Sequence, residues 1–190
     1  MYVRKALVIL LLGFCLFGAG VGSVTGQVTI LDNSTEGYYN LDLGTILDGT
    51  DMDRFPPANT FTGDYLIFWT EPDLTVAEDI LGDWLRTPFP TLNEHWSESP
   101  IVPPQYWVVN TEDAIVYPID AGGGYSGLLA TIGIDNGIHI WINGEFRYGT
   151  RRPEPMWLYD IPLGSLEPGM NYIQVLREDS GGGTYFSLVI

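Results

Sequence analysis

Cysteine and histidine are scarce in this chain, and their scarcity excludes several kinds of chemistry. Cys15 is the single cysteine, so an intramolecular disulfide is impossible. Neither His95 nor His139 lies in a His-x-Glu-x-x-His or similar zinc-binding pattern. There is no Gly-x-Ser-x-Gly motif, and the glycine runs 122–124 and 181–183 lack the lysine of a phosphate-binding loop. We therefore expect no enzymatic activity, with a glycan hydrolase built on unrecognised carboxylates as the alternative.

Positive charge is also scarce. The chain has eight Lys and Arg residues against 24 Asp and Glu, and Lys5 is its only lysine. Without Arg4 and Lys5 of the N-terminal stretch, six basic and 24 acidic residues remain, a net charge of −18. Such a field repels phosphate backbones and anionic lipid headgroups, which argues against nucleic-acid and membrane-surface partners. It suits solubility, or the attraction of Ca²⁺ and basic partners.

The N-terminus has the pattern of a secretory signal peptide. A basic region at 1–5 is followed by an apolar run at 6–22 and by small residues at 24–26. We expect cleavage after about Gly26, which would leave 27–190 as a single secreted or cell-surface domain. The alternative is an uncleaved membrane anchor or assembly helix, because an apolar run of ~18 residues can span a bilayer.

Short strands dominate the rest of the chain. Apolar runs between Gly, Pro and Asn turns predict an all-β sandwich or jelly roll with one or two short helices. A Thr-x-x-Glu capping box at 75–78 predicts a helix that stops before Pro88, and a second such pattern at 91–94 predicts a helical turn. We expect these helices to close an end of the sandwich. The predicted strands are 28–31, 38–43, 65–70, 107–110, 114–119, 128–134, 156–161, 172–177 and 185–189.

The strongest local signal is a hairpin over 132–149. Its Asn143-Gly144 pair is typical of a type I′ turn, in which both central residues adopt positive φ. Apolar residues alternate with ring and charged residues on both sides of the turn. This alternation predicts one face on a core and one polar, aromatic face.

The polar face of this hairpin is a candidate carbohydrate site. Sugar rings present C–H faces that stack on an aromatic plane, while polar side chains bind their hydroxyls. Trp141 would supply the plane, unless it is buried between layers of the sandwich. The doublet of Arg151 and Arg152 would bind carboxylated sugars, unless it pairs with Glu154. The candidate ligand-binding residues are Trp141, Asn143, Glu145, Arg147 and Arg151.

Several motifs in this half of the chain resemble those of a known module. They are Asp-x-Gly at 135–137, Trp-x-Asn-Gly at 141–144, Leu-x-Pro-Gly-x-Asn at 166–171 and a final strand with a Gly-rich loop. Together they are similar to the galactose-binding-like β-sandwich, a jelly roll appended to glycoside hydrolases and sialate esterases. Residues 96–100, 110–112 and 114–117 also resemble extracellular bacterial proteins of this fold that carry a PEP-CTERM tail. The resemblance covers about 75–190 and implies carbohydrate binding.

Two regions are candidate calcium ligands, although no cofactor is expected to be required. Asp48, Asp51 and Asp53 are spaced so that carboxylates and turn carbonyls can surround Ca²⁺, with a solvated acidic turn as the alternative. The resemblance implies a second region, because many galactose-binding-like modules hold a structural Ca²⁺ near one end of the sandwich. Asp179, just before the Gly-rich loop, would be a ligand there.

These features predict a secreted, non-catalytic binding or adhesion module. Its expected partner is an extracellular glycan or another cell-surface polymer. The alternative is a structural subunit of an extracellular filament, sheath or surface layer, which would self-assemble through exposed strands and aromatic patches.

Overall fold

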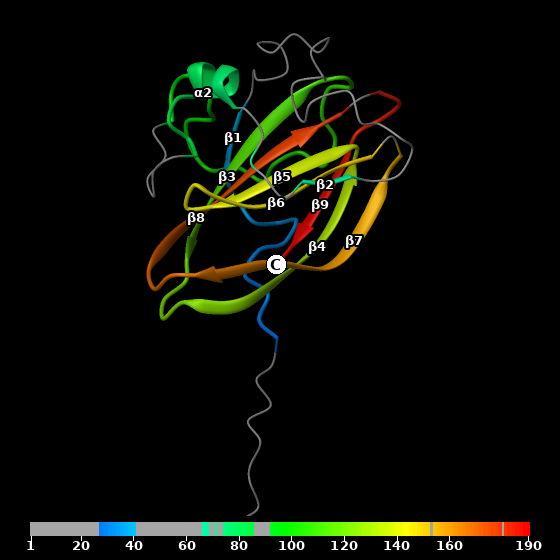
Figure 1. The fold of residues 1–190 in the computed structure, drawn as a ribbon. Helices are drawn as coiled ribbons and strands as arrows, with labels where there is room; N and C mark the ends of the chain where they lie inside the picture. The colour runs from blue at the N-terminus through cyan, green and yellow to red at the C-terminus, as the bar shows by residue number, and fades with distance from the viewer. Residues whose placement is uncertain are drawn as a thin grey trace, which may run out of the picture.

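The chain folds into a sandwich of two antiparallel sheets (Figure 1), which confirms the predicted all-β class. The structure, a computed structural model, describes residues 27–40, 66–68, 71, 74–85, 92–152, 154–179 and 181–190. The predicted signal peptide at 1–26 and the acidic stretch at 48–53 lie outside these residues.

The two sheets differ in size and share the chain unequally. The larger one contains, in spatial order, β1 (Tyr38–Tyr39), β3 (Glu112–Asp120), β8 (Met170–Glu178), β5 (Gly137–Ile142), β6 (Glu145–Arg151) and β2 (Leu66–Phe68). The smaller one contains β7 (Met156–Leu166), β4 (Tyr125–Asp135) and β9 (Tyr185–Val189). β3, β4, β7, β8 and β9 each contain a strand predicted from the apolar pattern. β5 and β6 are the two strands of the predicted hairpin.

The main core lies between the sheets. Alternate residues of each strand point inward, as Ile138 and Ile140 of β5 and Ile132 and Ile134 of β4 do, and all four are fully buried. Burying each such side chain contributes about 1.5–3 kcal/mol. This core holds the sheets face to face and fixes which residues of β4, β7 and β9 point away from it.

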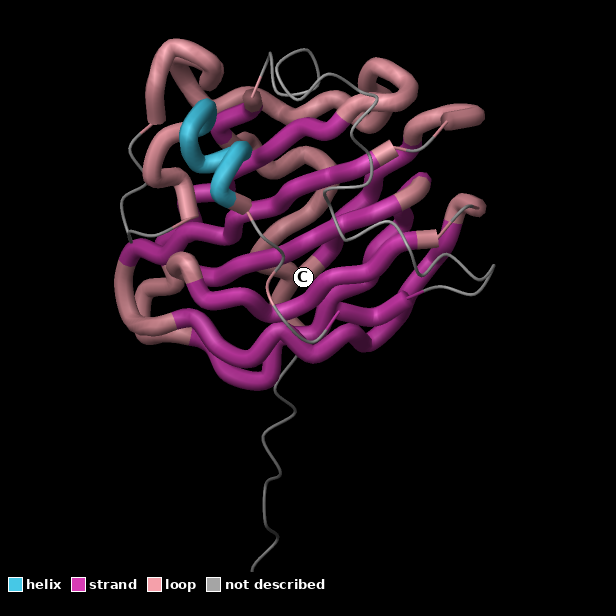
Figure 2. Tube along the Cα trace, turned by 45° about the horizontal axis from the view of Figure 1, so that its top comes forward, coloured by secondary structure: helices cyan, strands magenta, loops and turns pink. Residues whose placement is uncertain are grey.

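A second core covers the other side of the larger sheet, which we call the helix face. Here α2 (Thr75–Leu81) and the residues around Trp84 and Trp96 pack on β3, β5 and β8 (Figure 2). The Trp96 indole N–H donates to Leu81 O at 3.1 Å, and Gln174 Nε2 of β8 donates to Trp84 O at 3.2 Å. The expectation that the helical segment closes an end of the sandwich is wrong, because its apolar residues cover a face.

The boundaries of α2 also correct the sequence analysis. Thr75 is already the first helical residue, and Leu74 occupies the N-cap without a side-chain hydrogen bond, so the predicted capping box does not form. The helix ends at Leu81 because Gly82 has a φ of 74° and leaves the helical conformation. Of the helical turn predicted from 91, position 91 lies outside the described residues, and a turn is present at 94–95, where Trp96 N–H donates to Asn93 O at 3.1 Å.

The hairpin at 137–151 is confirmed as a type I′ turn between β5 and β6. Asn143 and Gly144 have φ values of 51° and 79°, as this turn requires. The Asn143 side chain secures the turn, since its Oδ1 accepts the Tyr172 N–H at 2.8 Å and its Nδ2 donates to Asn171 Oδ1 at 2.9 Å. Residues 132–135, however, belong to β4 in the opposite sheet, so the hairpin is shorter than predicted.

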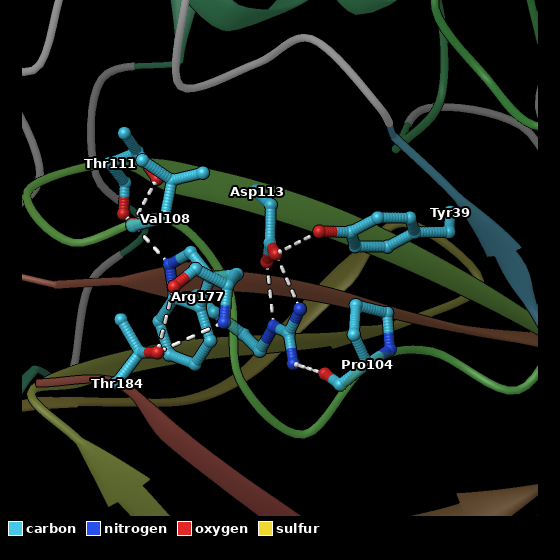
Figure 3. A network of polar contacts seen from close by, with 8 residues as sticks. Tyr39, Pro104, Val108, Thr111, Asp113, Arg177 and Thr184 are labelled. Carbon is cyan, nitrogen blue, oxygen red and sulfur yellow. Dashed lines mark hydrogen bonds and ion pairs between the residues drawn. The ribbon is translucent and has the colours of Figure 1, made fainter.

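One end of the main core contains a buried ion pair (Figure 3). The Arg177 guanidinium of β8 donates through Nε to Asp113 Oδ1 of β3 at 2.6 Å and through Nη2 to Asp113 Oδ2. Its Nη1 donates to Pro104 O at 2.8 Å, and the Tyr39 hydroxyl donates to Asp113 Oδ2 at 2.7 Å. The guanidinium carbon lies 4.4 Å from the ring centroid of Trp107. The pair thus joins the two sheet strands to the segment before β3.

Two expected strands are irregular in the structure. Residues 107–110 form a turn, and the Trp107 backbone bonds to a side chain instead of a strand: its N–H donates to Thr184 Oγ1 at 2.9 Å, and its C=O accepts from the same hydroxyl at 2.9 Å. The Trp107 indole N–H donates to Thr111 O at 3.0 Å (Figure 3). Residues 28–31 are not a regular strand, although Ile30 N–H donates to Ile190 O and Ile190 N–H to Leu31 O. In both places contacts distant in sequence decide the backbone.

The turn geometry predicts the effect of one substitution. Gly144→Val should lower the free energy of unfolding by about 1 kcal/mol or more, because a β-branched residue is strained at positive φ. Gly123→Val is the control, since Gly123 has nothing within 4 Å of an added Cβ and no positive φ. Urea denaturation would measure both, and equal stabilities of the two variants would contradict the turn assignment.

Candidate functional site

Trp141 lies in the core of the helix face. Its side chain is fully buried, and its ring centroid is 5.9 Å from that of Trp84 and 5.4 Å from that of Phe146. Its indole N–H donates to Glu71 Oε1 at 2.8 Å. Trp141 is therefore buried and does not offer a plane for sugar stacking. It is buried beneath the helical segment, not between the two sheets as the alternative had it.

The other residues predicted around Trp141 do not form one surface with it. The Asn143 side chain is used within the turn, as described above. Arg147 Nη2 pairs with Glu145 Oε2 at 2.7 Å, and Arg147 Nη1 lies 3.1 Å from the place that a Cβ on Gly164 of β7 would occupy. Arg147 therefore extends toward the smaller sheet, whereas Trp141 points to the opposite side.

Arg151 is buried and does not face a solvent-borne ligand. Its Nη2 lies 3.3 Å from Oε1 of the fully buried Glu178 of β8. Gly137 of β5 lies between Arg151 of β6 and Glu178 of β8. Its lack of a side chain leaves room for the ion pair, because a Cβ there would lie 3.0 Å from Glu178 Oε2. Burial, followed by the charge of Arg151, lowers the pKa of the neighbouring His139 to about 3. At neutral pH this histidine is uncharged.

The exposed aromatic surface lies on the opposite side of the molecule, on the outer face of β4, β7 and β9. Trp157 of β7 is 51% exposed, and its ring centroid is 5.7 Å from that of Tyr185 of β9. Tyr185 in turn lies 6.0 Å from Tyr106, which is 66% exposed. We call these three residues the aromatic platform.

The platform is built over a glycine. Gly133 of β4 pairs with both Trp157 and Ser187, and a Cβ on it would lie 2.9 Å from atoms of the Trp157 and Tyr185 rings. Because that position has no side chain, the two rings close over bare backbone and contact each other. A larger residue at Gly133 would separate the two rings, so the ring contact requires a glycine at this position.

Polar groups border the platform. Since Ile134 of β4 points into the core, its neighbour Asp135 points outward beside its cross-strand partner Tyr185. On the other side, Ser187 lies in the row of Gly133, and its Oγ accepts the Asn33 Nδ2–H at 2.9 Å. Asp135 and Ser187 are nearly buried at this border, whereas the side chain of Asn33 is exposed beside them.

Asp135 and Asp179 form a pair of nearly buried acids at one end of this surface. Burial, then the charges of Asp179 and Glu154, raise the pKa of Asp135 from its ordinary 3.8 to about 6. Burial also raises the pKa of Asp179, whose Oδ2 accepts the N–H groups of Asn110 and Gly181 while its Oδ1 is buried without a hydrogen bond. Within the described part of the chain, no three His, Cys, Asp or Glu side chains are grouped to hold a metal.

The aromatic platform was not predicted, although part of the sequence indicates an exposed aromatic row. Trp157 and Tyr159 alternate with Met156 and Leu158 in a predicted strand, the pattern of a strand with one outward aromatic row. The sequence does not show which aromatic row is covered, because α2 and the Trp96 segment cover the helix face through contacts made only in the folded chain. Tyr106 lies outside any strand and carries no local signal at all.

Comparison of the chain with protein-family models, with curated proteins and with solved structures found no match. No described helix has the length and hydropathy needed to cross a membrane.

The contrast between the two tryptophans predicts their effects on stability. Trp141→Ala should lower the free energy of unfolding by about 3–5 kcal/mol, because it empties a filled core site. Trp157→Ala should cost far less, since half of that side chain is already exposed to water. Guanidinium denaturation would measure both, and a Trp141→Ala protein as stable as the parent would contradict the burial of this ring.

The raised pKa of Asp135 predicts a pH-dependent effect. Between pH 3.8 and about 6 the folded state binds more protons than the unfolded state, so this residue's contribution to stability falls as the pH rises. In EDTA, Asp135→Asn should therefore raise the melting temperature at neutral pH, and the gain should vanish below pH 3.8. Glu167→Gln, an exposed carboxylate, is the control; a pH-independent difference for Asp135→Asn would contradict the shift.

Proposed function

We propose that this protein is a secreted, non-catalytic module that binds carbohydrate through the aromatic platform. The observation that carries the proposal is the row of Trp157, Tyr185 and Tyr106, which keeps ring surface exposed over a bare glycine. Exposed aromatic rings of this size cost free energy in water unless a ligand covers them. The predicted resemblance to galactose-binding-like modules points to the same class of ligand.

The geometry of the rings favours a single glycan chain in solution. The ring planes are inclined by 50° between Trp157 and Tyr185 and by 57° between Tyr185 and Tyr106. Such a twisted row does not match the flat surface of a crystalline polysaccharide. A flexible chain, by contrast, can place successive C–H faces on inclined rings while its hydroxyls reach the exposed Asn33 beside Ser187.

The charge of the chain favours a neutral glycan. The expected mature protein carries −18, and Asp135, Asp179 and Glu154 lie at the end of the platform. A sulfated or carboxylated polysaccharide would be repelled by this field. Of the arginine doublet predicted to bind carboxylated sugars, Arg151 is buried against Glu178 and does not offset this field.

Self-assembly into a filament or surface layer is the second candidate, since Trp157 and Tyr159 are exposed on β7, an edge strand. Edge strands can pair with another copy of the chain. The β7 edge, however, is irregular. Its register with β4 shifts, Asp160 has a φ of 56°, and Pro162 cannot donate a backbone hydrogen bond. These features disfavour strand addition and leave the glycan proposal ahead.

Calcium stays a proposal, with Asp179 as a ligand. Two observations support it. Asp179 Oδ1 is buried without a hydrogen bond, and the charge of Asp179 raises the pKa of Asp135, so the two carboxylates repel each other. The described residues supply only part of the six to eight oxygens that Ca²⁺ takes. If Ca²⁺ binds here, adding it in place of EDTA should remove the pH dependence attributed to Asp135, and an equal ionic strength of NaCl should not.

Affinity electrophoresis tests the glycan proposal with neutral soluble polysaccharides: xyloglucan, laminarin, galactan and galactomannan. At least one should retard the parent protein, and Trp157→Ala should weaken that binding about tenfold, since one aromatic contact is lost. Tyr159→Ala is the matched control, because Tyr159 is 65% exposed on the same strand but has no ring contact with the platform. Equal losses in both variants, or no retardation by any polysaccharide, would reject the proposal.

A further inference from the structure

An open cavity of about 520 Å³ lies at the β1 edge of the helix face, whereas the aromatic platform lies on the outer face of the smaller sheet. Tyr38 of β1 and Tyr172 of β8 stand on either side of β3, where Val116 forms the floor between them. The segment 92–98 closes the cavity opposite these strands. Its volume is in the range of sites that bind small molecules.

The walls of this cavity are held in place before any ligand arrives. Ser97 N–H donates to Tyr39 O at 2.8 Å, and Asn40 Nδ2 donates to His95 O at 3.0 Å, so the segment is tied to β1 at two points. Trp96 is fixed from behind by Trp84, whose ring centroid is 5.8 Å away. A preformed cavity loses little conformational entropy on binding.

The charged side chains among the described residues that line the cavity are both acidic. The Trp96 indole N–H is used by Leu81 O at 3.1 Å, and the Ser97 hydroxyl donates to Ser99 O at 2.8 Å. The exposed carboxylates of Glu94 and Glu98 remain at the rim, and among the described residues that line the cavity none is Lys or Arg. Burial, then Tyr38, raises the pKa of Tyr172, so its ring stays uncharged at neutral pH.

We propose that this cavity binds an alkylammonium group, a protonated primary amine on a short methylene chain. The ammonium would lie between the carboxylates of Glu94 and Glu98, and the methylenes would pack on the rings of Tyr38, Tyr172 and Trp96. Aromatic faces attract cations, and this attraction adds to the charge pairing. An anion would be repelled, and a neutral polyol would gain nothing from the two carboxylates.

Calorimetric titration of the folded protein with cadaverine tests the proposal, with 1,5-pentanediol as the uncharged ligand of equal length. Cadaverine should bind and pentanediol should not. Glu94→Gln with Glu98→Gln should weaken cadaverine binding about tenfold. Because any amine is drawn to an acidic protein, Glu154→Gln with Asp160→Asn, which removes the same charge elsewhere, is the control and should change the affinity less than twofold.

A further pair of variants separates the ring from its hydroxyl. Tyr172→Phe should retain cadaverine binding, whereas Tyr172→Leu should weaken it, and circular dichroism would show that both stay folded. Binding of Nα-acetyl-lysinamide would support the same chemistry supplied by a lysine side chain. Equal binding of pentanediol, or equal losses in the two charge variants, would overturn the proposal.

Discussion

The buried pair of Arg177 and Asp113 is the interaction on which this end of the sandwich depends. Burial disfavours a charged guanidinium, but the charge and hydrogen bonds of Asp113, with Tyr39 and Tyr117, together outweigh that effect, and the pKa of Arg177 lies above its ordinary value. Removing one partner of such a pair costs about 3–5 kcal/mol, because the other charge is left buried and uncompensated. The guanidinium also lies over the rings of Trp107 and Phe186 at 4.4 and 4.6 Å, so it joins both sheets through one side chain.

This pair also positions the proposed binding surface. By donating to Pro104 O, Arg177 holds the segment before β3 against the core, and Phe186 N–H donates to Gln105 O at 2.9 Å in the same segment. Tyr106 follows directly and meets Tyr185, the residue before Phe186. The third ring of the aromatic platform is therefore placed by contacts from β8 and β9, not by its own local structure.

Two groups of aromatic residues differ in whether another segment of the chain packs over them. On the helix face, the rings of Trp84, Trp96 and Trp141 are enclosed together and stabilise the fold. On the outer face of the smaller sheet, Trp157 and Tyr106 stay exposed because no described segment packs over them. We therefore propose the same aromatic stacking of a sugar, but on β7 and β9 instead of the hairpin of β5 and β6.

Local patterns were sufficient to predict the strands from 112 onward and the Asn143-Gly144 turn, because alternation and positive φ are properties of neighbouring residues. They failed at Thr75, where the position of a helix start decides whether a hydroxyl can cap it, and at 107–110, where side-chain bonds to Thr184 replace a strand. They left the burial of Trp141 open, and they failed for Arg151. Both residues have the alternation of an exposed face, and only packing by α2 or pairing with Glu178 shows that they are buried.

The assignment of binding to the platform is tested most directly by fluorine NMR of protein labelled with 5-fluorotryptophan, in which the chain's six tryptophans report separately. Trp157→Phe would assign the exposed resonance, and Trp84→Phe and Trp141→Phe would assign the two enclosed ones. A bound neutral polysaccharide should shift the Trp157 resonance and protect it from a soluble paramagnetic agent, while those of Trp84 and Trp141 stay unchanged. A ligand-induced shift confined to Trp84 and Trp141, with Trp157 unaffected, would contradict it.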